Sequence, residues 1–233
     1  MSNNEAPIGI VCATASEAAP FFEHLEGARA GHKALMDIRR GALSGMPAVV
    51  VCCGIGKTNA AMAAQALIYE GARAIVNPGA GGGISPEVGL FDIVVAECVQ
   101  HHDVDAQTML VESFPHYPSG VFACDEALVA AARAAATSAS IGGQVRYGKT
   151  VSGEQFIDDA QRDSIVKATG GLAVDMEGAA IGQVCFANGV PFITVRSITD
   201  TAAHDGYGNY EANAARAASE VFAFTREMLL HLG

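Results

Sequence analysis

The sequence predicts an α/β protein, with one three-layer α/β/α domain built around a central mixed, twisted β-sheet. Short apolar runs alternate with alanine-rich helical segments along the whole chain. Acidic side chains follow several of the apolar runs, which is where the strands of an open sheet deliver functional groups. No linker interrupts the 233 residues, of which 50% are hydrophobic, so we expect residues 1–233 to form a single domain.

The composition and charge of the chain limit the classes of ligand that the protein can bind. The net charge of −11 and the lack of a basic stripe with interleaved aromatic residues argue against nucleic-acid binding. Residues 1–7 do not resemble a signal peptide, and no apolar run reaches the ~18 residues that span a bilayer. We therefore expect a cytoplasmic protein with no membrane contact and a small, uncharged ligand. The six cysteines form no CxxC pair, which favours reduced thiols over disulfides or zinc.

The first elements are a buried strand at residues 8–13 and a helix that opens at Ser16. Glu17 lies just beyond that strand. It could contribute to a site, or it could be a carboxylate that favours the helix N-terminus through the macrodipole. A polar, hairpin-like stretch at residues 34–43 follows, and then a second buried strand at residues 48–53.

Glycine-rich segments follow the strand at residues 48–53 and the strand after it. Residues 54–59 resemble the start of a dinucleotide fingerprint, but Asn59 replaces its third glycine, so we expect only a tight turn before an alanine-rich helix. After a strand at residues 74–77, the segment 78–83 has almost no side-chain bulk. It could let the backbone approach a ligand closely, or it could be a flexible turn.

The middle of the chain contains a possible metal cluster. His101, His102 and the two nearby aspartates follow a strand that begins at Ile93, but adjacent histidines do not readily share one ion, so we expect no metal. Residues 106–122 are predicted to form a long loop beside a pocket or a subunit interface. A helix at residues 125–136 comes next.

Residues 143–150 match the phosphate-loop pattern GxxxxGK[ST] letter for letter. The interior of this segment is strand-like and no helix opens after it, so we do not expect it to bind phosphate. The segment 151–159 is a further loop after a strand. Its Phe156 could stack on a flat base or could belong to the core.

The stretch 172–200 predicts a strand, a helix that ends at Asn188, and a second strand. The first strand is followed by Glu177 and the second ends at Asp200. Each acid alone could cap a helix or start a turn. Two acids at the ends of adjacent parallel strands favour a site. A long C-terminal helix at residues 211–230 is expected to cover the sheet.

The order of these motifs resembles the 5′-methylthioadenosine/S-adenosylhomocysteine nucleosidases, which belong to the purine nucleoside/uridine phosphorylase superfamily. The similarity runs nearly end to end, and its last two segments are the most specific. The segments that carry it are residues 9–11 with Glu17, 53–57 with 59–61, 78–82, 102–105, 152–157, 174–180 and 196–200.

The resemblance implies a nucleoside phosphorylase-like fold and hydrolysis of the N-glycosidic bond of 5′-substituted adenine nucleosides. In that reaction Asp200 would protonate N7 of adenine, Glu177 would hold the ribose hydroxyls, and Glu17 would activate water. It also implies a homodimer, a role in nucleoside catabolism and methionine salvage, and no cofactor or metal. The hydrolases commonly have serine where Ala80 stands, so substrate range or rate can differ here.

The same resemblance assigns further residues to substrate binding. Phe156 would stack on adenine, the backbone of Ile157 would read its edge, and Met176 would pack under the ribose. Ile55 and Tyr210 would line the 5′ pocket with residues near Met109. Arg196 would organise Glu17 or the water. The remaining candidates for substrate binding are Ala80, Gly81, Gly82 and Asp175.

Three other functions remain open. A sister nucleosidase could act on futalosine or aminodeoxyfutalosine in menaquinone synthesis. A purine nucleoside phosphorylase would use phosphate, but those enzymes usually carry an arginine where this chain has residues 77–79, Asn-Pro-Gly. A nucleoside-binding protein without catalysis would not need a paired acid and base, and all three acids are present.

Overall fold

The computed structural model describes residues 6–113, 116–203 and 207–232, so part of the expected 106–122 loop lies outside the described residues. The strands are β1 (Ile8–Cys12), β2 (Glu26–Lys33), β3 (Met36–Leu43), β4 (Met46–Cys52), β5 (Ala74–Gly83), β6 (Ile93–His101), β7 (Val121–Ala123), β8 (Val145–Ser152), β9 (Ala173–Asp175) and β10 (Phe192–Asp200). The helices are α1 (Ala15–Glu23), α2 (Lys57–Tyr69), η1 (Gln107–Glu112), α3 (Glu126–Ala135), α4 (Asp159–Thr169), α5 (Gly178–Asn188) and α6 (Tyr207–Leu230).

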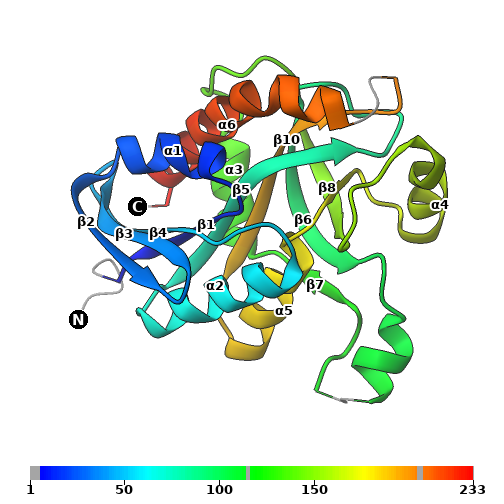
Figure 1. The fold of residues 1–233 in the computed structure, drawn as a ribbon, viewed down its shortest axis with the longest axis horizontal. Helices are drawn as coiled ribbons and strands as arrows, with labels where there is room; N and C mark the ends of the chain where they lie inside the picture. The colour runs from blue at the N-terminus through cyan, green and yellow to red at the C-terminus, as the bar shows by residue number, and fades with distance from the viewer. Residues whose placement is uncertain (1–5, 114–115, 204–206, 233) are drawn as a thin grey trace.

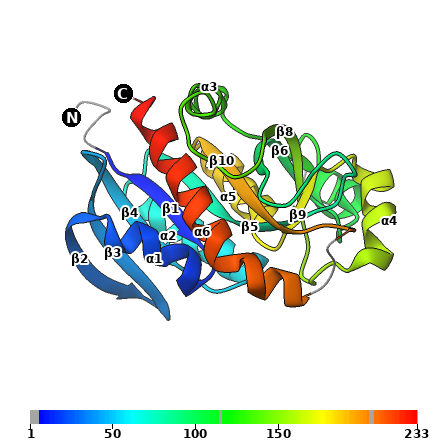
Figure 2. The ribbon, with the colours of Figure 1, turned by 90° about the horizontal axis from the view of Figure 1, so that it is seen from above.

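These elements form the expected three layers, a mixed sheet between two layers of helices. In Figure 1, α1 and α6 cover one face of the sheet, while α2 and α5 pack together on the other. Figure 2 shows the long helix α6 lying across the strands, with α4 apart from it at the far end of the molecule. The central strands β1 and β10 are buried on both faces. The apolar sequence of β1 predicts this burial, whereas β10 also buries polar and charged residues.

Strand β5 organises the sheet because it pairs with three others. It runs parallel to β1 and β10 and antiparallel to β9. Since β6 and β8 connect β10 to β9, these five strands close into a ring. The prediction that residues 172–200 form adjacent parallel strands is therefore wrong, because β5 separates β9 from β10 and β9 runs the other way. Gly82 nevertheless pairs with both Val174 and Asp200, so both strands bring their acids to the same end of β5.

The glycine-rich segment 78–83 is strand rather than turn, because β5 continues through it to Gly83. Side chains from neighbouring strands take the space that its missing side chains leave. A Cβ at Gly81 would lie 3.2 Å from the Arg196 side chain, and one at Gly82 would lie 3.0 Å from Asp200 Oδ2. Tertiary packing thus outweighs the low strand preference of glycine.

The sequence did not predict four elements, one of which is the short strand β7 at the end of the expected 106–122 loop. Strand β2 is almost wholly exposed and therefore lacks an apolar run, so the hairpin with β3 begins earlier than expected. Helix α4 is mainly polar, and the one-turn element η1 lies inside the expected 106–122 loop. Residues 145–150 of the phosphate-loop pattern lie in β8, where the Lys149 ammonium donates to Gln100 Oε1 at 2.9 Å and to the carbonyl oxygen of Thr169 at 2.7 Å. In the part of the chain that the structure describes, no helix is long and apolar enough to cross a membrane.

Candidate active site

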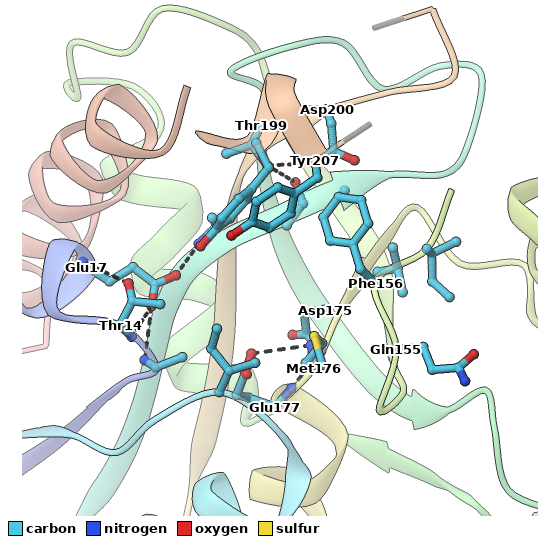
Figure 3. Close-up of a pocket in the computed structure, with 18 residues that line it drawn as sticks. Thr14, Glu17, Gln155, Phe156, Asp175, Met176, Glu177, Thr199, Asp200 and Tyr207 are labelled. Carbon is cyan, nitrogen blue, oxygen red and sulfur yellow. Dashed lines mark hydrogen bonds between the residues drawn. The ribbon is translucent and has the colours of Figure 1, made fainter. Parts of the chain in front are cut away.

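A cavity of about 450 Å³ opens where β5, β9 and β10 end beside α1 and α6 (Figure 3). Twelve of the thirteen predicted site residues line it, and Arg196 does not. They are Glu17, Ile55, Ala80, Gly81, Gly82, Phe156, Ile157, Asp175, Met176, Glu177, Asp200 and Tyr210. Three acids that are far apart in the sequence, Glu17, Glu177 and Asp200, therefore share one cavity.

Glu17 serves both the helix and the cavity. It forms a capping box with Thr14 at the start of α1, which is the structural role considered from the sequence. Its Oε2 also accepts hydrogen bonds from the backbone N–H groups of Ala13 at 3.0 Å and Thr14 at 2.9 Å, and its Oε1 accepts from Ala80 N–H at 2.8 Å. Backbone donors from two segments of the chain thus fix this carboxyl group at the cavity wall.

Glu177 is held where β9 passes into α5. The backbone N–H of Gly56 donates to its Oε1 at 2.9 Å, and Gly56 has φ +103°, which glycine adopts without strain. Burial, followed by the negative charge of Asp175, raises the pKa of Glu177 to about 7, although Arg196 and the Gly56 hydrogen bond act in the opposite direction. A group with this pKa can exist in either protonation state near neutral pH.

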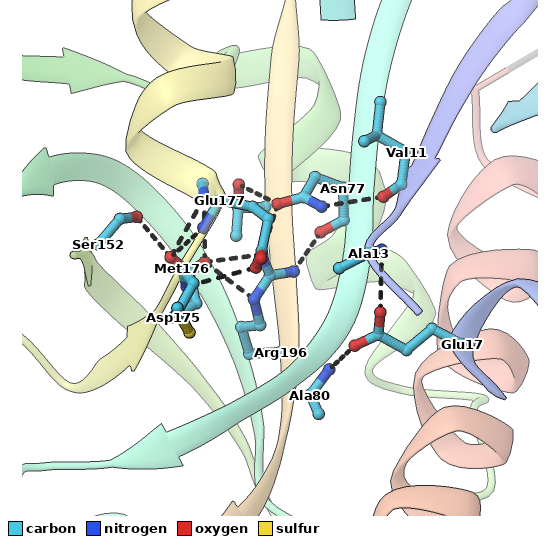
Figure 4. A network of polar contacts seen from close by, with 12 residues as sticks. Val11, Ala13, Glu17, Asn77, Ala80, Ser152, Asp175, Met176, Glu177 and Arg196 are labelled. Carbon is cyan, nitrogen blue, oxygen red and sulfur yellow. Dashed lines mark hydrogen bonds and ion pairs between the residues drawn. The ribbon is translucent and has the colours of Figure 1, made fainter. Parts of the chain in front are cut away.

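Arg196 is buried and does not line the cavity, but it joins a network of polar contacts with Asp175, Glu177 and Asn77 (Figure 4). Its Nε and Nη2 atoms bind Asp175 Oδ2 at 2.9 and 2.7 Å, its Nη1 donates to the Asn77 carbonyl oxygen at 2.8 Å, and Nη2 lies 3.9 Å from Glu177 Oε2. Asp175 Oδ1 also accepts a hydrogen bond from the Ser152 hydroxyl. The described ion pairs of Arg196 join Asp175 and Glu177 rather than Glu17, while its expected role towards the water stays a prediction. The wide reach of its planar guanidinium suits it to this bridging position.

Asp200 is buried at the end of β10, with a hydrogen-bond donor on each carboxylate oxygen. The hydroxyl of Thr199 lies 2.7 Å from Oδ1, and Nη2 of Arg162 lies 2.6 Å from Oδ2. Arg162 is itself 1% exposed and comes from α4. Sequence reasoning missed Arg162, because nothing in a polar helix indicates which of its charged residues turns inward.

Aromatic side chains cover one side of the cavity. The Phe156 ring centroid lies 5.8 Å from that of Tyr207 and 6.2 Å from that of Tyr210. Phe156 is 41% exposed, so the alternative that it belongs to the core is wrong. Burial, followed by the charge of Glu17, raises the pKa of Tyr210 to about 12, so its phenol stays protonated at neutral pH.

Further residues line the cavity beyond the predicted set. Most adjoin predicted residues in the sequence, but Tyr207 follows the undescribed residues 204–206 and no pattern indicated it. Met109, expected near the 5′ pocket, is not part of the wall. The additional lining residues are Ala13, Thr14, Gln155, Val174, Thr199 and Tyr207.

The described lining residues include no lysine or arginine. The cavity therefore combines an aromatic surface with four carboxyl groups, of which Asp175 is paired with Arg196. This combination suits acid and base chemistry on a flat, uncharged ring system. Among the described residues no cluster of three or more His, Cys, Asp or Glu side chains could hold a metal ion. In the segment considered for metal binding, His101 Nε2 hydrogen-bonds to Gln183 Oε1 at 3.0 Å, and Asp103 pairs with the Lys57 ammonium at 2.6 Å.

The fold and this cavity define a protein of the Phosphorylase superfamily, whose family model matches residues 7–230. The 5′-methylthioadenosine/S-adenosylhomocysteine nucleosidase of Marinomonas sp. (strain MWYL1) is 34% identical over 95% of this chain and 97% of that protein. The same-named protein of Shewanella sediminis is 36% identical over 90% of this chain and 93% of its own length.

Solved structures of nucleosidases with the same name are also similar to this chain. The nucleosidase of Neisseria meningitidis in complex with methylthio-immucillin-A superposes with a TM-score of 0.88 at 28% identity, over 96% of this chain and 98% of that one. The Colwellia psychrerythraea nucleosidase in complex with adenine superposes with a TM-score of 0.88 at 30% identity, over 98% of this chain and 96% of that one. The chain belongs to the 5′-methylthioadenosine/S-adenosylhomocysteine nucleosidase family.

Proposed function

We propose that this protein hydrolyses the N-glycosidic bond of 5′-methylthioadenosine and S-adenosylhomocysteine, giving adenine and the corresponding thioribose. One observation carries the proposal. Glu17, Glu177 and Asp200 come from separate elements and open into one cavity with an aromatic side. Departure of the base builds positive charge on the ribose and negative charge on adenine, and the three carboxyl groups can serve both.

In the proposed reaction the C1′–N9 bond breaks and its electron pair leaves with adenine. Asp200 donates a proton to N7 of the base. Glu177 binds the ribose hydroxyls, and in its ionised form it stabilises the cationic sugar. Glu17 accepts a proton from water as the water oxygen bonds to C1′. The backbone hydrogen bonds from Ala13, Thr14 and Ala80 that fix Glu17 support this last role.

The other lining residues give the proposed substrate its orientation. Phe156 stacks on adenine beside the Ile157 backbone, and Met176 packs under the ribose. Ile55 and Tyr210 face the 5′ substituent. Gly81 and Gly82 bring the backbone of β5 to the cavity wall next to Asp200.

Water rather than phosphate is the proposed nucleophile. A phosphate dianion would require cations at the cavity surface, and the described lining residues carry none. Arg162 and Arg196 lie behind the wall and are already paired with the side chains of Asp200 and Asp175.

The test is chromatography of the products formed from methylthioadenosine, S-adenosylhomocysteine, aminodeoxyfutalosine and inosine, with and without phosphate. Adenine and free thioribose from the first two substrates in phosphate-free buffer are the expected products. A requirement for phosphate would make the enzyme a phosphorylase, and preferred cleavage of aminodeoxyfutalosine would make it the sister nucleosidase. Release of no base from any of the four would leave a binding protein.

We further propose a cytoplasmic homodimer that acts in nucleoside catabolism and methionine salvage. Exposed apolar side chains on α2, η1 and α5, among them Met62, Met109 and Phe186, support a dimer because they leave an apolar surface uncovered. Light scattering at micromolar concentration should give twice the chain mass of 23.9 kDa. A monomer mass at that concentration would contradict the dimer.

A further inference from the structure

One buried guanidinium connects three parts of the wall on the side of Asp200. Arg162 Nη2 lies 2.6 Å from Asp200 Oδ2 and 3.4 Å from the carbonyl oxygen of Ile157, and its Nη1 donates to the carbonyl oxygen of Gly83 at 2.6 Å. These partners lie at the end of β10, in the loop before α4, and at the end of β5. Arg162 does not line the cavity, so it can act on a ligand only through them.

The strand that faces Asp200 offers no side-chain donor to its carboxyl group. Gly82 pairs with Asp200 in the sheet, and Gly81 and Ala80 precede it. Of the contacts that the structure describes, those that hold the two carboxyl oxygens come from Thr199 and Arg162. Thr199 is the adjacent residue and moves with Asp200, so Arg162 fixes the carboxyl group relative to the rest of the wall.

A guanidinium suits this position better than another cation would. Its planar fork has several N–H donors in fixed directions, so one side chain can bind a carboxylate and two carbonyl oxygens at once. Burying a charged group is unfavourable unless it is paired and hydrogen-bonded, and an apolar side chain could fill the same volume. The geometry of the fork is therefore the property that an apolar residue could not reproduce.

We propose that Arg162 is a positioning residue for catalysis, which orients the Asp200 carboxyl group towards the base and aligns it with the Ile157 backbone. This inference rests on the proposed function, in which Asp200 protonates the base. Proton transfer depends on hydrogen-bond geometry, and a displacement of about 1 Å can lower a rate by about 10²-fold.

The test compares the full-length parent with Arg162→Met, Arg162→Lys and a control, Arg146→Met. Arg146 also pairs with an aspartate, its Nε lying 2.6 Å from Asp92 Oδ2, but neither residue lines the cavity. The control thus loses an arginine–aspartate pair without touching the site. Adenine release from methylthioadenosine gives kcat and KM, and thermal unfolding reports whether each variant is folded.

Arg162→Met should lower kcat by about 10²-fold with little change in KM, and Arg162→Lys should lose less because it keeps the charge without the fork. Arg146→Met should keep the parent kcat. A folded Arg162→Met variant with the control's kcat, or one with a raised KM and unchanged kcat, would overturn the proposal. If Arg162→Met does not fold, Arg162→Lys decides, and the parent kcat in that variant would refute the role of the fork. A parent that releases no adenine would refute the proposed function itself.

Discussion

Replacing Glu177 with glutamine should stabilise the protein at alkaline pH. The pKa of Glu177 is raised from 4.5 to about 7, mainly by burial and then by the charge of Asp175. A carboxyl group whose pKa is higher in the folded state stabilises the fold below the unfolded value, and this contribution is lost as the pH rises through the folded value. Each pH unit is worth about 1.4 kcal/mol, so the ionised group costs about 3 kcal/mol at pH 8.

Glutamine keeps the shape of the side chain and can still accept the Gly56 hydrogen bond, but it carries no charge. Urea unfolding of the parent and of Glu177→Gln at pH 5 and pH 8 measures the difference. The variant's advantage in unfolding free energy should be about 2 to 3 kcal/mol larger at pH 8 than at pH 5. Glu23→Gln, an exposed carboxylate on α1, is the matched control. An advantage that does not change with pH would refute the reasoning.

Three further predictions concern activity. Asp200→Asn should lower kcat by about 10² to 10⁴-fold, because the amide keeps the shape but has no acidic proton; adenine release at near-parental rate would rule out Asp200 as the acid. Glu17→Gln should lower kcat over the same range of about 10² to 10⁴-fold while still binding a non-hydrolysable nucleoside analogue in calorimetry. If it turned over substrate at the parental rate, the base would lie elsewhere. Excess chelator should leave turnover unchanged, and a loss of activity would direct attention back to His101 and His102.

The acids of the site could be predicted because their signal is local. Glu17, Glu177 and Asp200 each follow an apolar run that forms a strand. Ligands bind at the edge of an open sheet where such strands end. The direction of β9 could not be predicted. This strand has three residues, and its orientation depends on pairing with β5 and β8 rather than on its own sequence.

Arg162 and Arg196 show the limit of prediction in side-chain networks. Arg196 lies in a recognisable segment next to Asp200, so its presence near the site was predicted while its partners were not. Arg162 lies 38 residues from Asp200 in the chain, on a helix without a clear apolar stripe. Its inward orientation depends on carbonyl oxygens of Gly83 and Ile157, and the sequence does not encode their positions locally.

A crystal structure with a non-hydrolysable methylthioadenosine analogue would test the account most directly. We predict Asp200 within hydrogen-bonding distance of the base at position 7, Glu177 on the ribose hydroxyls, and a water molecule between Glu17 and C1′. An analogue bound outside this cavity, or bound inside it with any of the three carboxyl groups out of reach, would contradict the central claim.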